Sequence, residues 1–105
     1  MEEQYFDKIR TLFCSEYDSV KPGKMMSSEA VTFKGKVFAF FSRKQHMVFK
    51  LGRNFDASTT DIEIRTFSPF KNRAPMRGWF EVPYTAKEHW EPLALQALNT
   101  LKNEL

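Results

Sequence analysis

The chain has one cysteine and two histidines, residue types that can serve as a nucleophile, a general base or a metal ligand: Cys14, His46 and His89. The two histidines lie far apart in the sequence, and neither has a second ligand at the spacing of a zinc site. Acid–base catalysis also needs a positioned partner for the imidazole, so we do not expect a general-base role for either histidine. We therefore expect His46 in a solvated loop, and His89 at the surface or against Trp90 near the start of a helix.

Cys14 is the only cysteine, which excludes an internal disulfide and a cysteine-rich zinc site. It ends a segment with helical periodicity, so we expect a buried or half-buried structural thiol rather than a nucleophile. The chain has no G-x-x-x-x-G-K-S/T, G-x-G-x-x-G, G-x-S-x-G or H-E-x-x-H motif, and its four glycines stand singly. These observations predict a protein that is not an enzyme and that uses no metal and no cofactor.

Basic and aromatic residues are interleaved between Phe67 and Trp79. Side chains of these types pair with phosphates, stack on bases or anchor a protein partner. The candidate contacts for a nucleic acid or a protein partner are Phe70, Lys71, Arg73, Arg77 and Trp79. The alternative is structural: the aromatic residues Phe67, Phe70 and Trp79 hold an irregular loop against a sheet, and their charged neighbours are solvated.

The net charge of +3 is unevenly distributed along the chain. Residues 1–18 contain two basic and five acidic side chains, whereas residues 19–80 contain twelve basic and four acidic ones. Residues 81–105 are again acidic, with two basic and four acidic side chains. A basic middle can mark an anionic partner, or it can be a solvated layer partly neutralised by acidic helices. A second basic set lies in two hairpin loops that need not form one patch: Lys34, Lys36, Arg43 and Lys44.

Periodicity predicts the elements that position these residues. Apolar residues recur at helical spacing over residues 3–14, and Lys21-Pro22-Gly23 then predicts a break. Lys34-Gly35-Lys36 is typical of a tight hairpin turn. Alternating apolar and polar residues predict strands at 31–33, 37–41, 47–51, 78–82 and, as a short edge strand, 61–66.

The segment 37–41 is apolar on both of its expected faces. Strict alternation places Val37, Ala39 and Phe41 on one face of the sheet and Phe38 and Phe40 on the other. A strand of this kind is expected in the middle of a sheet that is covered on both sides, by its own chain or by a partner.

The C-terminal segment carries the strongest helix signal. Thr85 and Glu88 are spaced as a capping box, with Thr85 as the N-cap. Pro92 lacks an amide donor, so the start of this helix is expected to be kinked or 3₁₀-like. The order of elements predicts one α+β domain over residues 1–105, an antiparallel meander of four to five strands with an N-terminal and a C-terminal helix packed on it.

No apolar run is long enough to cross a bilayer, so we expect no membrane association through a spanning helix. The acidic, helix-forming start MEEQYFDKIR is unlike a signal peptide. Together with the single cysteine, these features favour the cytoplasm as the location of the chain.

Several runs resemble the N-terminal domain of TfoX/Sxy-like proteins. They are Gly23-Lys24-Met25-Met26, the hairpin Phe33 to Ala39, Val48 to Leu51, the run Phe70 to Pro83, and Trp90-x-x-Leu93-x-x-x-Ala97. The resemblance covers about residues 5–103 and implies a compact α/β sandwich related to the MmcQ/YjbR-like fold, usually found in the bacterial cytosol. Full-length TfoX proteins are competence regulators with a second, helical domain, for which 105 residues leave no room.

The resemblance supplies no catalytic residue set, which agrees with the missing catalytic motifs. We therefore expect a stand-alone, non-enzymatic binding or regulatory module that contacts another protein or itself. The alternative is weak, non-specific nucleic-acid binding through the basic sheet and loops, as suggested for MmcQ/YjbR-like relatives. A third possibility is a small-ligand or enzymatic pocket lined by the many phenylalanines.

Overall fold

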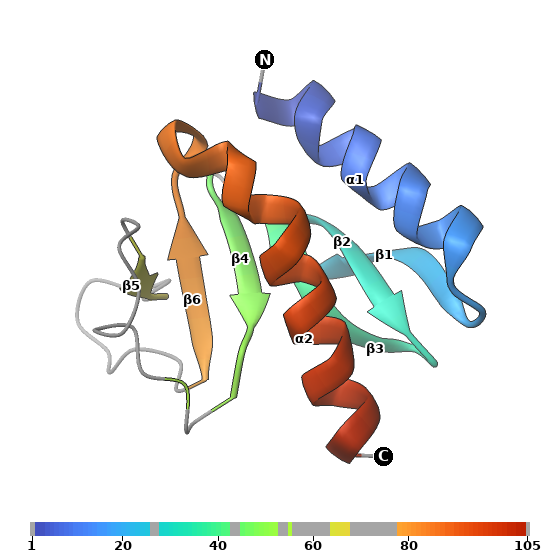
Figure 1. Ribbon diagram of the computed structural model, residues 1–105. Helices are drawn as coiled ribbons and strands as arrows, with labels where there is room; N and C mark the ends of the chain where they lie inside the picture. The colour runs from blue at the N-terminus through green and yellow to red at the C-terminus, as the bar shows by residue number, and fades with distance from the viewer. Residues whose placement is uncertain are drawn as a thin grey trace.

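The computed structural model describes residues 2–25, 28–42, 45–52, 55, 64–67 and 78–104. Within these residues the chain forms two α-helices, a 3₁₀ helix and one antiparallel six-stranded sheet (Figure 1). The helices are α1 (Glu2–Glu16), η2 (Tyr84–His89) and α2 (Trp90–Glu104). The strands are β1 (Val20–Met25), β2 (Ser28–Phe33), β3 (Lys36–Phe41), β4 (Met47–Lys50), β5 (Arg65–Thr66) and β6 (Trp79–Val82).

The predicted α+β class is confirmed, with one more strand than the upper estimate of five. The sheet order is β1-β2-β3-β4-β6-β5, so the first four strands form a meander and β6 then lies between β4 and β5. The short segment Arg65–Thr66 forms the far edge, where an edge strand was predicted.

The additional strand is β1, which contains the Lys21-Pro22-Gly23 run that was predicted as a break. Proline is tolerated in β1 because this strand is an edge of the sheet, where an amide donor can be missing from one side. Glycine is also needed at position 23 of β1. A Cβ atom there would clash with Thr32 on β2, because it would lie 2.6 Å from the Cγ2 atom. The lack of a side chain thus permits close packing between β1 and β2.

Both helices cover the same face of the sheet, α1 over β1 and α2 over β3 and β4 (Figure 1). They run in the same general direction, because Tyr5 contacts Trp90 near both helix starts and Tyr17 lies beside Lys102 near both ends. None of the helices among the described residues has the length and apolarity needed to cross a membrane.

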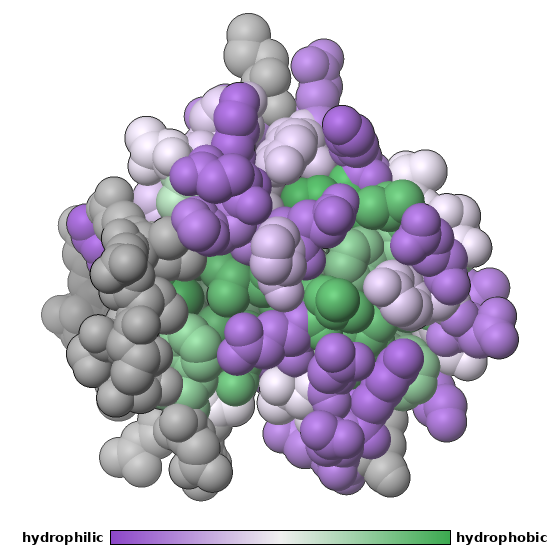
Figure 2. All heavy atoms as spheres, in the orientation of Figure 1, coloured by the Kyte–Doolittle hydropathy of each residue, from purple (hydrophilic) through white to green (hydrophobic). Residues whose placement is uncertain are grey.

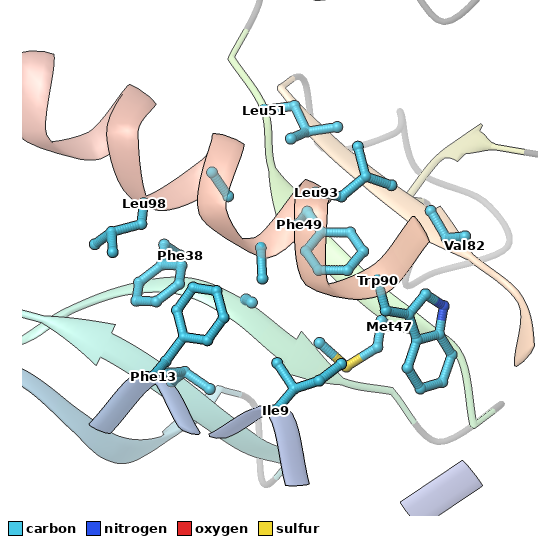
Figure 3. Packing of buried hydrophobic residues seen from close by; sticks show 14 of the residues in the cluster. Ile9, Phe13, Phe38, Met47, Phe49, Leu51, Val82, Trp90, Leu93 and Leu98 are labelled. Carbon is cyan, nitrogen blue, oxygen red and sulfur yellow. The ribbon is translucent and has the colours of Figure 1, made fainter. Parts of the chain in front are cut away.

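The main core lies between this helical layer and the sheet. Figure 3 shows Phe13 of α1 beside Phe38, and Trp90 and Leu93 of α2 over Met47 and Phe49. All of these side chains are buried. Burial of one large apolar side chain stabilises a fold by about 1.5–3 kcal/mol, so this layer accounts for much of the driving force for folding.

Because β3 contains a β-bulge, the predicted orientation of its side chains is wrong in part. Val31 pairs with Ala39 while the adjacent Thr32 pairs with Val37, which leaves Phe38 as the extra residue. Phe38 and Ala39 therefore both belong to the helix-side core, although strict alternation predicted opposite faces. Only Phe40 of the predicted Phe38–Phe40 pair lies on the other face.

The second face of the sheet carries a smaller apolar cluster, as expected for a strand that is apolar on both sides. Ala30, Phe40, Val48 and Phe67 are buried there, and partly buried hydrophobic residues pack around them: Met25, Val37 and Trp79. Strand β3 is thus covered on both faces within one chain.

The start of the C-terminal helix differs from the predicted capping box. Residues Tyr84–His89 form the 3₁₀ helix η2, its N-cap is Pro83, and no side chain makes a capping hydrogen bond. The prediction of a 3₁₀-like start is confirmed, and Pro92 lies in the first turn of α2, where helical amides have no intrahelical partner. The indole Nε1 of Trp90 donates to the carbonyl of Pro83 at 3.2 Å and ties the two helices to the end of β6.

Candidate functional site

Four of the five predicted contact residues lie outside the described residues: Phe70, Lys71, Arg73 and Arg77. The fifth, Trp79, is half-buried, and its ring lies 5.7 Å from that of Phe40. Phe67 packs edge-on against the same Phe40 ring at 5.2 Å, and its amide donates to the Trp79 carbonyl at 2.8 Å. Phe67 and Trp79 therefore have the packing role that was the structural alternative.

His46 is not a purely solvated loop residue, which corrects the prediction. Its Nδ1 lies 3.4 Å from Oε2 of Glu81, and its amide donates to Ser42 Oγ at 3.3 Å. Glu81 is only 8% exposed on β6, and a buried carboxylate requires a polar partner. His89 lies half-buried at 3.7 Å from Glu88, in agreement with its predicted position near a helix start.

The groups that could perform chemistry are not gathered at one place. Cys14 lies on α1, whereas the His46–Glu81 pair joins the start of β4 to β6. Among the described residues, no group of three or more His, Cys, Asp or Glu side chains could hold a metal ion.

One surface depression lies between α1 and β1. It is an open trough of about 640 Å³ lined by Arg10, Thr11, Cys14, Ser15, Pro22 and Glu29. Its charges neutralise one another, because Arg10 bonds to Asp7 at 2.9 Å and to Glu29 at 3.1 Å. Lys24 also donates to Glu29, and this hydrogen bond, followed by that from Arg10, lowers the pKa of Glu29. Both charged residues among the described lining of the trough, Arg10 and Glu29, are thus already paired with opposite charges.

A second depression lies between α1 and α2, and we call it the interhelix groove. It has a volume of about 250 Å³ and is lined by Leu12, Phe13, Glu16, Tyr17, Glu91, Pro92 and Leu95. Leu95 is 38% exposed and is the only exposed large hydrophobic side chain among the described residues. Figure 2 shows hydrophobic surface (green) between hydrophilic flanks where the two helices lie side by side.

The charged residues of the interhelix groove are acidic. Glu16 stands on the α1 wall and Glu91 on the α2 wall, and neither has an ion-pair partner in the described part of the chain. Glu16 is the last residue of α1, where the unpaired helix carbonyls already carry partial negative charge. A cation lies close to the groove at Tyr17, because the ammonium of Lys102 lies 5.4 Å from the centre of the Tyr17 ring.

Sequence reasoning missed this groove, although one signal was available. The buried face of α2 consists of Trp90, Leu93, Ala94, Ala97, Leu98 and Leu101. Leu95 falls outside that stripe, and an apolar residue on the polar face of an amphipathic helix is a sequence-level hint of a contact surface. The sequence does not indicate that Leu95 and Glu16 line the same groove, because the two residues lie near opposite ends of the chain.

A positively charged region lies next to the interhelix groove, because Lys102 lies over the ring of Tyr17, which lines that groove. The ammonium groups of Lys34 and Lys102 lie 5.4 and 5.6 Å from the centre of the Phe33 ring. Lys36 is exposed beyond the Gly35 turn of the same hairpin, and Lys21 is exposed on the neighbouring strand β1. The tertiary structure thus adds Lys102 to the predicted Lys34 and Lys36, whereas Arg43 and Lys44 lie outside the described residues.

Comparison with models of protein families, with curated proteins and with solved structures finds no match to this chain.

Proposed function

We propose that this chain is a non-enzymatic binding or regulatory module of the TfoX N-terminal-like kind that acts in the bacterial cytoplasm through protein–protein contacts. The observation that carries the proposal is the interhelix groove, with Leu95 exposed beside it. Protein interfaces combine an apolar centre with a polar rim, and this groove has both. Regulation by such a module requires only a surface that another protein can bind.

Two further observations support a binding role over catalysis. The thiol of Cys14 and the imidazole of His46 belong to different parts of the fold, and the described charges of the α1–β1 trough are paired. A catalytic site would bring a nucleophile, a base and an open cavity together. The arrangement of both terminal helices on one sheet face is also compatible with the fold that the TfoX resemblance implies.

The proposal is tested by photocrosslinking in the native host. A photoreactive amino acid is placed at position 95, with the adjacent exposed position 96 as the matched control. The crosslinked protein is then purified, and its affinity for the wild-type chain and for Leu95→Ser is measured. We expect a protein adduct that forms at 95 and not at 96, and weaker binding of Leu95→Ser. Equal adducts at both positions, or equal affinities, would contradict the proposal.

The second candidate function is weak, non-specific nucleic-acid binding. It is favoured by the positions of four lysines. The ammonium groups of Lys34 and Lys102 both lie over the ring of Phe33, and Lys21 and Lys36 are exposed on the adjoining strands. Binding to double-stranded DNA should weaken steeply with salt, because each neutralised phosphate releases counterions. The variant Lys34→Gln/Lys102→Gln should reduce both the affinity and the salt slope, whereas Lys8→Gln on α1 should not. Binding that is insensitive to salt would remove this candidate.

A further inference from the structure

We propose that the interhelix groove binds a cationic amphipathic helix of a partner protein. One or two apolar side chains of that helix enter the groove beside Leu95, and flanking Lys or Arg side chains pair with Glu16 and Glu91. This inference rests on the proposed protein-binding function and names the chemistry of the partner at the same groove.

The size of the groove indicates side chains rather than a free small molecule. Its volume of about 250 Å³ lies below the range of about 300–1,000 Å³ that is usual for small-ligand pockets. The walls are formed by Leu12 and Phe13 on one side and by Pro92 and Leu95 on the other. The groove lies between two helices, and an amphipathic helix is a common occupant of an apolar groove.

The charge of the groove selects the partner. Most of the other described carboxylates have an ion-pair partner, as in the pairs Glu29–Lys24 and Glu104–Lys50. Glu16 and Glu91 have no such partner among the described residues, and both line the groove. An acidic segment would be repelled there, and a neutral one would cover two carboxylates without compensation.

The position of Glu16 strengthens the argument. An acidic residue in the last turn of a helix interacts unfavourably with the helix dipole, and the last turn of α1 contains no basic residue. Asp18 follows Glu16 closely and adds negative charge at the same helix end. Lys102 offsets part of this field near Tyr17, so the attraction should be moderate and sensitive to salt.

The test uses two synthetic peptides of about 14 residues, long enough to form a helix on binding. Both peptides have leucine at helical spacing. All remaining positions are lysine in the first peptide and glutamate in the second. Binding is measured by fluorescence anisotropy, and the contacted amides are mapped by NMR on the full chain. We expect the lysine peptide to bind, with shifts at Leu12, Tyr17 and Leu95, and the glutamate peptide not to bind.

Three variants separate the groove from bulk charge. Glu16→Gln/Glu91→Gln should weaken binding of the lysine peptide roughly threefold to tenfold. The matched control Glu2→Gln/Glu3→Gln removes the same charge from the first turn of α1, outside the groove, and should change little. Leu95→Ser should weaken binding by at least about fivefold. Circular dichroism verifies that each variant is folded.

The outcomes distinguish this inference from the proposed function. If the control double variant weakens binding as much as Glu16→Gln/Glu91→Gln, the attraction is bulk charge and the inference is overturned. If the glutamate peptide binds equally well and with the same dependence on Leu95, the groove is a protein-binding surface without cation selectivity. In that case the inference fails and the proposed function survives. If no peptide binding depends on Leu95, the inference is also overturned, and photocrosslinking at position 95 decides the proposed function separately.

Discussion

Glu16 and Glu91 line the same groove from opposite helix ends, the C-terminal end of α1 and the N-terminal end of α2. The helix dipole therefore disfavours the first carboxylate and favours the second. Two residues of the same charge, at the same surface site, thus have opposite effects on the stability of the fold. This relationship allows binding and folding to be separated by experiment.

Replacing Glu16 by lysine should stabilise the protein, while Glu91→Lys should destabilise it. We expect changes of about 0.3–1 kcal/mol in the free energy of unfolding at low salt, because charge reversal at a helix end acts through the dipole. Urea denaturation at low and at high salt measures both effects, which should shrink as salt increases. Equal signs for the two variants would show that the helix dipole does not govern these positions.

Phe13 and Phe38 should be energetically coupled. Their ring centres lie 6.4 Å apart because the bulge turns Phe38 toward the helices. A double-mutant cycle of Phe13→Leu and Phe38→Leu should give a coupling energy of about 0.5–1.5 kcal/mol. The matched cycle of Phe13→Leu and Phe40→Leu should give none, since Phe40 lies on the other face. The reverse result would place Phe38 where strict alternation predicts it.

Glu29 should contribute to stability above the acidic range and lose this contribution as the pH falls. The pKa of Glu29 is lowered in the folded chain, first by the hydrogen bond from Lys24 and then by that from Arg10. A lowered folded-state pKa stabilises the fold when the carboxylate is ionised in both states, and the effect disappears below the folded-state pKa. Glu29→Gln should therefore be less stable than wild type at neutral pH and equally stable in acid. Thermal unfolding as a function of pH measures this difference; a gap that persists in acid would exclude the ionic origin.

Gly23→Ala should destabilise the sheet through a clash with a single methyl group. The new Cβ atom would lie 2.6 Å from Cγ2 of Thr32, and overpacking of this kind costs about 1–3 kcal/mol. Thr32→Ser removes that methyl group and keeps the hydroxyl that donates to the Lys21 carbonyl. Thr32→Ser should therefore rescue Gly23→Ala in chemical denaturation. If the double variant is as unstable as Gly23→Ala, the loss has another cause.

Thr85→Ala should leave stability nearly unchanged, although Thr85 occupies the first position of a capping-box pattern. Its side chain makes no capping hydrogen bond in η2, whereas loss of a true N-cap costs about 1 kcal/mol. Glu88→Gln serves as the companion variant, since it tests the reciprocal half of the box. If Thr85→Ala lowers the free energy of unfolding by about 1 kcal/mol, Thr85 does act as the N-cap of a capping box.

The local periodicity of the sequence determined most of the elements. The helical spacing of Phe6, Ile9 and Phe13 marks the buried face of α1, and the hairpin at Gly35 follows from its turn chemistry. Helix and strand periods are properties of neighbouring residues, so they can be detected without knowledge of the fold. The α+β class, the covered central strand and the 3₁₀-like start of α2 follow from such local signals.

The tertiary structure decided the features that depend on distant residues. Lys21-Pro22-Gly23 forms a strand because β1 is an edge, and Phe38 faces the helices because of a bulge in its pairing with β2. His46 lies beside Glu81, which is 35 residues away in the sequence. The interhelix groove also needs both ends of the chain, since Glu16 and Leu95 meet only when α1 and α2 lie on the same sheet face. Register, edge position and helix spacing are set by packing between remote segments, and no local pattern of residues contains that information.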